Sequence, residues 1–330
     1  MTSPRAIGPV RFGPGAEFDL IRRLVNPADL LPMGVSLGPG DDAAVLEGGW
    51  VLSTDISLEG VHFRRVWLED KEIGFRAVSC ALSDLAAMGA VPVGVFVSMA
   101  ANDEEVVEAL QSGCREAASE AGAVILGGDL SNTSGPVFID VVGLGSTNRP
   151  GLRSGAITGN DIWVTGRLGA SSTAVRVWQC GGEPPPEARK AFARPSPRCE
   201  EGYYLVEQGI ANALIDLSDG LAGDSAHLAA ASGVQIVLEA AAIPVAPIAV
   251  EVLGPEKALQ VALHGGEDYE LCFAAGPDAV DPSYFQDHFG LEITRVGHVC
   301  EGSGVWIDQG GSDPEPLMRS GFDHYAADVL

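Results

Sequence analysis

The chain has 330 residues, 46% of them hydrophobic, and 45 acidic against 20 basic side chains give a net charge of -25. This composition is typical of a globular protein long enough for two domains. It argues against a nucleic-acid partner, because no excess of basic side chains is available to neutralise phosphates. No apolar run is long enough to span a membrane and the N-terminal residues lack a secretory signal, so we expect a cytoplasmic protein without membrane attachment.

The spacing of the cysteines and the lysines argues against three common kinds of site. None of the six cysteines has C-x-x-C spacing, which disfavours a zinc ribbon or a thioredoxin-type site. The three lysines, Lys71, Lys190 and Lys257, do not follow a glycine-rich loop, so the chain has no Walker A motif. If the protein handles phosphate, metal ions and backbone N–H groups must supply much of the positive charge.

After a predicted helix over Glu17–Leu24, apolar residues at 43–46 and 51–52 predict two short buried strands. Oxygen ligands border this hairpin, and their type suits a hard cation such as Mg²⁺. They are Asp41, Asp42, Ser53, Thr54 and Asp55. The alternative is a hairpin with aspartates in its turns, because Asp is a common turn residue.

The next predicted helix, Lys71–Met88, places a carboxylate among small apolar side chains. The neighbours of Asp84 one turn away are Cys80, Ala81, Ala87 and Met88. A carboxylate in such surroundings is either buried and paired, or directed at a metal ion, or it lies on a solvated edge of the helix.

Strands and helices then alternate, which predicts an α/β or α+β fold. We expect a strand over 92–100, a helix capped by Asn102 with Glu105 in a capping box, and a buried strand over 123–126. That strand runs into Gly127-Gly128-Asp129, where two glycines allow a close approach of a ligand to the backbone. A further strand is expected over 137–144.

A Gly/Ser/Thr-rich stretch over 146–160 indicates a boundary between an N-terminal domain, 1–147, and a C-terminal domain, 148–330. The Pro-rich segment 181–197 is expected to be an irregular surface loop. The remaining predicted elements are strands over 161–165, 213–217, 234–238, 270–274, 293–299 and 305–307, and helices over 170–180, 200–208 and from 220 to 231.

Acidic residues recur where predicted strands end, and ligands bind at the carboxyl ends of strands in α/β sheets. The set comprises Asp42, Asp55, Asp129, Asp216, Asp219 and Glu267. One such acid is ordinary turn chemistry, but a repeated pattern of them indicates a ligand site.

Nine motifs carry a resemblance that covers residues 38–325. They are GPGDDAAVL, STDISLEGVHF, ALSDLAAMGA, LGGD, LRSG, RPSPR, IDLSDGL, GGEDYELCF and SGFDHY. Each is weak alone, but together and in this order they resemble the thiamine-monophosphate kinase family of the aminoimidazole-ribotide-synthetase-like ATP-binding superfamily.

The resemblance implies ATP-dependent phosphorylation of thiamine monophosphate to thiamine diphosphate with several Mg²⁺ ions. It implies a two-domain α/β (α+β) fold, in which the N-terminal sheet domain pairs in a homodimer. By matched position, the metal ligands are Asp42, Ser53, Thr54, Asp55, Asp84, Asp129, Asp216 and Asp219. Among them, the resemblance implies a catalytic role for Asp84, Asp129 and Asp219.

The resemblance also assigns the two substrates to residues. ATP would contact Gly128, Asp129, Arg153 and Ser218, and thiamine monophosphate would contact His62, Glu267 and Phe322. Without the resemblance, His62 reads as a packed core histidine and Glu267-Asp268 as a solvated turn. The segment 130–134 departs from the family pattern, which has a Thr-rich, Arg-containing turn, and this puts side-chain contacts to phosphate from that turn in doubt.

Since the attacking phosphate oxygen is already anionic, the chemistry needs no strong base, and direct in-line transfer is expected. Rivals within the superfamily are selenophosphate synthetase, a purine-pathway ligase and the hydrogenase-maturation dehydratase. Against the first, the earliest cysteine, Cys80, lies inside a predicted helix, and against the last, the chain ends at Leu330 and not at a cysteine. A rival of another class is a non-catalytic acidic nucleotide- or Ca²⁺-binding module, although no EF-hand loop is present.

Overall fold

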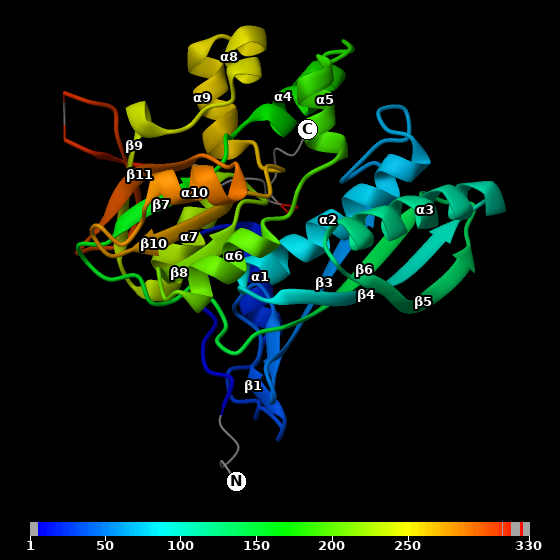
Figure 1. The fold of residues 1–330 in the computed structure, drawn as a ribbon, viewed down its shortest axis with the longest axis horizontal. Helices are drawn as coiled ribbons and strands as arrows, with labels where there is room; N and C mark the ends of the chain where they lie inside the picture. The colour runs from blue at the N-terminus through cyan, green and yellow to red at the C-terminus, as the bar shows by residue number, and fades with distance from the viewer. Residues whose placement is uncertain (1–5, 312, 318–323, 326–330) are drawn as a thin grey trace.

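The computed structural model describes residues 6–311, 313–317 and 324–325. Two sheets organise these residues, one built from 35–146 and the other from 161–316 (Figure 1). The predicted mixed α/β fold is confirmed. No helix within the described ranges is long and apolar enough to cross a bilayer.

The first sheet has six strands in the order β1-β2-β3-β6-β4-β5. Along β3, buried Val51 and Ser53 alternate with exposed Trp50 and Thr54, so one face of the sheet is covered and the other is open. The strands are β1 (Val35–Leu37), β2 (Ala44–Leu46), β3 (Trp50–Leu58), β4 (Val91–Ala101), β5 (Val124–Asn132) and β6 (Phe138–Ser146).

Two helices, α2 (Asp70–Ala87) and α3 (Glu104–Glu120), pack closely beside this sheet (Figure 1). A Cβ at Gly74 would lie 1.9 Å from the Leu110 carbonyl oxygen, and one at Gly113 would lie 1.8 Å from that of Lys71. The helices therefore meet at a distance that only glycine permits. Nearly every residue of α2 from Ile73 onward is buried, which makes it the central helix of this half.

Within the described residues the second sheet has seven strands in the order β13-β12-β9-β11-β7-β10-β8, and among these the β9–β12 pair alone is parallel. Its strands are β7 (Asp161–Thr165), β8 (Ala211–Asp216), β9 (Gln235–Glu239), β10 (Leu271–Ala275), β11 (Ile293–Cys300), β12 (Gly304–Asp308) and β13 (Glu315–Pro316).

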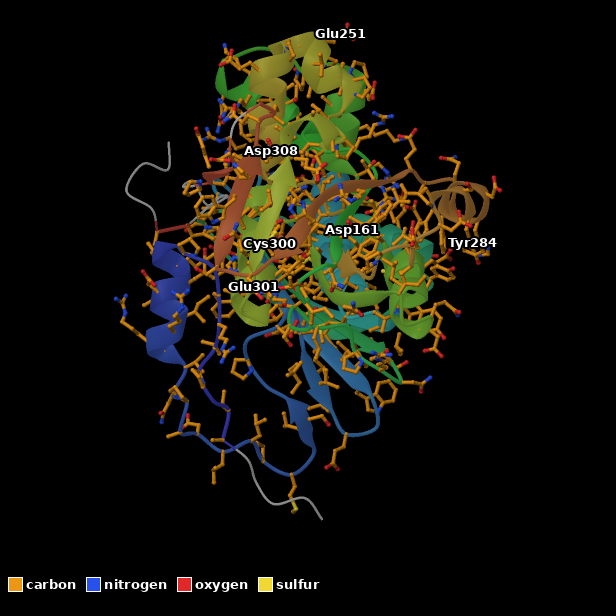
Figure 2. The ribbon with its side chains drawn as sticks, turned by 90° about the vertical axis from the view of Figure 1, so that its left-hand side faces the viewer. Asp161, Glu251, Tyr284, Cys300, Glu301 and Asp308 are labelled. Carbon is orange, nitrogen blue, oxygen red and sulfur yellow. The ribbon has the colours of Figure 1, made fainter. Side chains whose placement is uncertain are left out.

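Helices surround this second sheet, with Glu251 of α8 at the top of the molecule and Tyr284 of α10 at its right edge in Figure 2. One apolar cluster contains Leu85 of α2, Val141 of β6 and Phe273 of β10, so the two halves share a core. Besides α2 and α3 the helices are α1 (Ala16–Leu24), α4 (Ala170–Gln179), α5 (Pro186–Ala193), α6 (Cys199–Glu207), α7 (Leu221–Ser232), η1 (Ala240–Ala242), α8 (Pro247–Leu253), α9 (Pro255–His264) and α10 (Pro282–Phe289).

Several local predictions were wrong. The segment 181–197 is not wholly irregular, because Pro186 begins α5, and proline is well tolerated in the first turn of a helix. The helices over 247–264 and 282–289 were not predicted. The cap of α3 is Asp103, whose carboxylate accepts from the Glu105 N–H, and not Asn102. The strand predicted as buried over 123–126 belongs to β5, an exposed edge strand that continues through the two glycines to Asn132.

Candidate functional site

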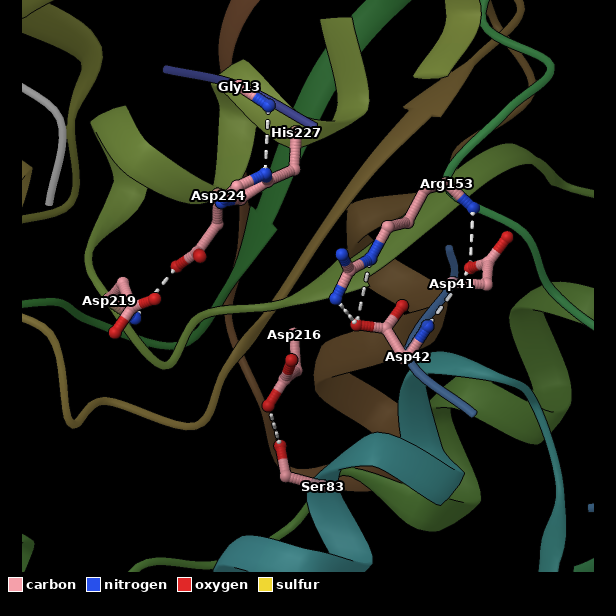
Figure 3. A network of polar contacts seen from close by, with 9 residues as sticks. All are labelled: Gly13, Asp41, Asp42, Ser83, Arg153, Asp216, Asp219, Asp224 and His227. Carbon is pink, nitrogen blue, oxygen red and sulfur yellow. Dashed lines mark hydrogen bonds and ion pairs between the residues drawn. The ribbon is translucent and has the colours of Figure 1, made fainter. Parts of the chain in front are cut away.

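Three carboxylates from distant parts of the chain meet where the two sheets approach each other. Asp42 precedes β2, Asp84 lies in the last turn of α2, and Asp216 ends β8. Each offers an oxygen atom within 4.8 Å of the others. In addition, Ser83 Oγ donates a 2.6 Å hydrogen bond to Asp216 Oδ2 (Figure 3). The odd placement of Asp84 in the sequence is thus explained by a half-buried position beside two other acids.

The surroundings of these acids oppose their ionisation. Burial raises the pKa of Asp216 to about 7, with Asp42 adding to the effect. Burial, followed by the charges of Asp216 and Asp42, also raises the pKa of Asp84 well above its usual range. Asp42 Oδ2 is buried and has no hydrogen-bond partner in the described part of the chain. An unpaired buried oxygen in an all-carboxylate group fits a hard divalent cation.

Arg153 provides positive charge at this acidic cluster. Its Nη2 and Nε lie 2.6 Å and 3.1 Å from Asp42 Oδ1, and its backbone N–H donates to Asp41 Oδ1 at 3.0 Å (Figure 3). Burial and the charge of Asp42 raise the pKa of Asp41 to about 7. Arg153 is therefore held at the site by hydrogen bonds to Asp41 and to a predicted metal ligand, Asp42.

The alternation of β3 separates its three predicted ligands. Ser53 Oγ donates to the Ala81 carbonyl of α2 at 3.2 Å, and Asp55, two residues further on, lies on the same face. Burial, then the charge of Glu267, raises the pKa of Asp55 to about 7. Thr54 points to the opposite, exposed face, where its hydroxyl donates to Asp140 Oδ1 at 2.9 Å.

Asp129 also belongs to the exposed face of the first sheet. The strand register aligns Ile56, Asp140, Ser98 and Asp129 in one row across β3, β6, β4 and β5. The structure thus brings Thr54, Asp140 and Asp129 to one face, away from the Asp42, Asp84 and Asp216 group. The predicted single shell of ligands is divided between two faces of the sheet.

The loop after β8 holds Asp219 beside the acidic cluster. Burial, followed by the charges of Glu17 and Glu267, raises the pKa of Asp219 to about 8. Asp224 Oδ2 accepts from the backbone N–H groups of Asp219 and Gly220, both at 3.1 Å, and thereby fixes the loop (Figure 3). Ser218 lies next to this acid, and its carbonyl accepts from the Glu267 N–H at 2.8 Å.

The N-terminal arm is attached to the same region. His227 of α7 accepts a 3.0 Å hydrogen bond from the Gly13 N–H at Nδ1 (Figure 3). The rings of Phe12 and Phe18 contact the imidazole, and burial lowers the pKa of His227 to about 3. A neutral histidine therefore anchors the arm that brings Glu17 toward Asp219.

Two of the three residues predicted to contact the thiamine substrate lie in the described part of the chain. His62 Nδ1 accepts from the Leu58 N–H at 3.0 Å, and burial lowers the pKa of His62. Glu267 forms an ion pair with Arg76 and accepts from the Tyr269 hydroxyl at 2.8 Å. Phe322 lies outside the described residues. His324, two positions later, packs its ring 5.1 Å from that of His62.

The idea that all six acids end strands was wrong in part. Asp216 ends β8, but Asp55 and Asp129 lie inside β3 and β5, because both strands extend further than the apolar runs that predicted them. Sequence reasoning also left several polar partners without a role, because their significance depends on contacts across the fold. These partners are Arg76, Ser83, Asp140 and Asp224.

Comparisons with known proteins identify relatives of this chain. The family model described as AIR synthase related protein, N-terminal domain, matches residues 40–147. The curated thiamine-monophosphate kinase of Rhodopirellula baltica is 35% identical over 315 residues, 89% of this chain and 93% of the relative. A solved complex of AaThiL with AMPPCP and TMP is 30% identical with a TM-score of 0.77, covering 90% and 94% of the two chains. The Escherichia coli hydrogenase maturation protein HypE, at 22% identity, coverage of 81% and 84%, and a TM-score of 0.68, shares the fold.

Proposed function

The chain belongs to the thiamine-monophosphate kinase family, and from that membership we propose an Mg²⁺-dependent reaction at the Asp42, Asp84 and Asp216 cluster. The enzyme phosphorylates thiamine monophosphate to thiamine diphosphate with ATP. The observation that carries the metal assignment is the buried oxygen of Asp42 that lacks a partner, beside two further carboxylates. Two polyanionic substrates must meet on a protein of net charge -25, so their phosphates need cations.

The ions would be held by residues on both faces of the first sheet. When bound, Mg²⁺ would supply positive charge that neutralises the phosphates of the two substrates. Asp42, Asp84, Asp216 and Asp219, with Asp55 from the same side of β3, are proposed as the inner group. Ser53 is proposed to belong to the inner group, where its hydroxyl already bonds to the Ala81 carbonyl of α2. Thr54 and Asp129, on the exposed face of the sheet, are proposed as a second, outer group of ligands. Asp84, Asp129 and Asp219 are the acids expected to matter most for turnover.

The nucleotide is proposed to lie near the glycine pair of β5. Gly128 has φ of 153°, and a Cβ there would meet the Val97 carbonyl oxygen at 1.8 Å, so only glycine fits. Arg153 is a bidentate donor already held at Asp42, and it could exchange this partner for a phosphate. Asp129 and Ser218 complete the proposed ATP contacts.

Thiamine monophosphate is proposed to bind between His62 and Glu267. Because Leu58 donates to His62 Nδ1, the neutral imidazole carries its proton on Nε2 and acts as a donor. Glu267 is an acceptor. The two residues therefore offer one donor and one acceptor, which complements an aminopyrimidine edge.

Direct in-line transfer needs little from the protein beyond positioning and charge. The nucleophile is a phosphate oxygen of thiamine monophosphate, which is anionic near neutral pH, so no strong general base is required. Cys80 is unsuitable as a covalent nucleophile, because it is buried in α2 and burial raises its pKa far above the usual range. This also argues against a selenophosphate synthetase that depends on a reactive cysteine.

We further propose that two chains pair through the open face of the first sheet. This face carries large exposed apolar side chains from three strands, a feature typical of an interface with another protein. A second copy is the natural occupant, since closed twofold dimers are the commonest assembly of identical chains. The side chains are Trp50, Ile56, Val91, Val93, Phe96, Val124 and Leu126.

A cytoplasmic location is consistent with the cysteines, all six of which are free thiols in the structure. Disulfides are rare in that reducing compartment.

An ADP-release assay tests the proposed reaction. We expect ADP formation to require thiamine monophosphate, to stop when EDTA is added and to return with excess Mg²⁺. ADP release without thiamine monophosphate, or nucleotide binding with no turnover, would favour the rival superfamily activities or the non-catalytic binding module. Undiminished turnover in metal-free buffer would overturn the assignment of the acidic cluster.

A further inference from the structure

We propose that Arg76 and Tyr269 are positioning residues that hold the Glu267 carboxylate with one oxygen turned toward thiamine monophosphate. The inference rests on the proposed role of Glu267 as a substrate contact, and it gives Arg76 and Tyr269 a role in the same reaction.

Both donors bind the same oxygen of the carboxylate. Arg76 Nη2 pairs with Glu267 Oε2, and the Tyr269 hydroxyl donates to that same Oε2 at 2.8 Å. Oε1 accepts from neither of them. The Arg76 side chain is 4% exposed and that of Glu267 is 23% exposed, so the donors are buried and the carboxylate retains an open side. Two donors on one oxygen fix the plane of the carboxylate and leave Oε1 for a ligand.

Arg76 is itself held in place by α5. Its Nη1 donates to the Phe192 carbonyl at 2.8 Å, and its Cζ lies 4.1 Å from the centroid of the Phe192 ring. The Phe192 ring packs edge-on against Trp67 and Trp178, which stack on each other with centroids 5.1 Å apart. The Pro-rich segment 181–197 therefore has a function, because it supplies the support that keeps this guanidinium from rotating away.

The backbone around Glu267 is unusual in a way that suits a fixed side chain. Glu267 and Tyr269 have φ of 67° and 51°, a region that non-glycine residues seldom adopt. Their N–H groups donate to the carbonyls of Ser218 and Leu217, both at 2.8 Å. The loop is thus clamped to the end of β8, and such constrained backbone is typical of functional sites.

The chemistry identifies what Oε1 can bind. The Glu267 carboxylate acts electrostatically on His62 and opposes the lowering of the His62 pKa, so the two residues lie in the same region. The exocyclic amino group of the pyrimidine is the N–H donor of thiamine monophosphate. We infer that Oε1 accepts from this amino group, and that the geometry set by Arg76 and Tyr269 contributes to specificity for it.

The experiment measures KM for each substrate in two variants. Tyr269→Phe removes only the hydroxyl. Arg76→Lys keeps the positive charge but loses the planar guanidinium and its paired N–H donors. We expect KM for thiamine monophosphate to rise about 10-fold in each variant, because that is the usual effect of losing a hydrogen bond to a charged group. KM for ATP should stay within about twofold of the parent value. Arg194→Lys is the matched control, because Arg194 lies over the Phe75 ring at 3.8 Å but pairs with surface acids. Its KM values should stay near those of the parent.

A double-mutant cycle separates positioning from general packing. If Tyr269 acts through Glu267, Tyr269→Phe should add less than twofold to KM for thiamine monophosphate in a Glu267→Gln background. A full 10-fold effect in that background would overturn the inference. Likewise, normal KM values in both Tyr269→Phe and Arg76→Lys would overturn it, provided that Glu267→Gln alone raises KM for thiamine monophosphate.

A different result would instead reject the proposed substrate role. If Glu267→Gln leaves KM for thiamine monophosphate unchanged, Glu267 is not a substrate contact, and both the proposed role and the inference fail. An analogue of thiamine monophosphate with hydrogen in place of the amino group provides a second probe. The parent enzyme should bind it about 10-fold more weakly than thiamine monophosphate, and Tyr269→Phe should reduce this preference. Equal binding of both compounds by the parent would exclude the amino group as the ligand of Oε1.

Discussion

Ser83 of α2 donates a 2.6 Å hydrogen bond to Asp216 at the end of β8, joining residues 133 positions apart. The donor comes from the first half of the chain and the acceptor from the second. Because Asp84 follows Ser83, the same contact fixes the approach of Asp84 to Asp216. The acidic cluster is thus assembled by the contact between α2 and the second sheet.

The first prediction concerns Asp84. Asp84→Asn retains the shape of the side chain but removes a charge from the proposed metal site, so kcat should fall about 100-fold or more. The metal-free variant should melt at a higher temperature than the metal-free parent, because burial and two neighbouring carboxylates disfavour the charge. Steady-state kinetics and thermal melts in EDTA would measure both effects.

Asp70→Asn is the control for that variant. Asp70 lies in the same helix but pairs with Arg65 near the surface, so its removal should change kcat less than about threefold. A folded Asp84→Asn protein with full activity would show that α2 does not face the reaction site.

The second prediction is a pH dependence of stability that Mg²⁺ abolishes. Asp41, Asp55 and Asp216 have pKa values raised to about 7, and Asp219 to about 8, from 3.8. For acids whose pKa is higher in the folded state, the folded state binds more protons, and stability is lost as pH rises toward the folded pKa. The Tm of metal-free protein should therefore fall by about 3 °C or more between pH 6.5 and 8.5.

Saturating Mg²⁺ should remove most of that decline, since it neutralises the same carboxylates and binds more tightly when they are ionised. Melts with and without Mg²⁺ across this pH range provide the test. A metal-free Tm that is constant or rises with pH would contradict the predicted ionisation of these four acids.

The third prediction separates the two substrate sites. His62→Ala should raise KM for thiamine monophosphate about 10-fold and leave KM for ATP nearly constant, because His62 is proposed to contact thiamine monophosphate and not the nucleotide. The control is His298→Ala, a histidine of β11 that lies beside Glu239. If His62→Ala weakens ATP instead, the assignment of the two substrates is reversed.

The fourth prediction concerns assembly. Light scattering at micromolar concentration should give about twice the 34.2 kDa chain mass. Phe96→Glu introduces a charge on the open face of the first sheet and should shift the mass toward that of one chain. Val66→Glu is the control, since Val66 is 87% exposed and lies outside that sheet. A parent protein that is monomeric and active would disprove the proposed pairing.

Local sequence patterns predicted most strands and helices near the site but not the faces on which their side chains lie. The apolar run 51–52 predicted a strand, yet β3 continues to Leu58, because pairing with β6 stabilises polar residues that have no apolar pattern. The short helices α8 to α10 were missed because each begins at a proline, which reads as a break in the absence of tertiary contacts.

Long-range pairings explain the rest of what the sequence could not reveal. Arg76 and Glu267 are 191 residues apart, and their pairing depends on how α2 packs against the loop before β10. Conversely, the unusual position of Asp84 was detectable, because a carboxylate among small apolar residues of one helix already indicated a special environment.

The alternation of β3 has a consequence for how this enzyme can diverge. Ser53, Thr54 and Asp55 serve opposite faces of one sheet at consecutive positions. Deleting or inserting one residue between Trp50 and Ser53 would turn Asp55 outward and Thr54 toward α2, exchanging a carboxylate for a hydroxyl on each side. Insertions and deletions should therefore be tolerated in loops such as 181–185, whereas β3 should change only by substitution of its residues. In a design that grafts β3 onto another scaffold, keeping the number of residues in the strand matters more than keeping each residue type.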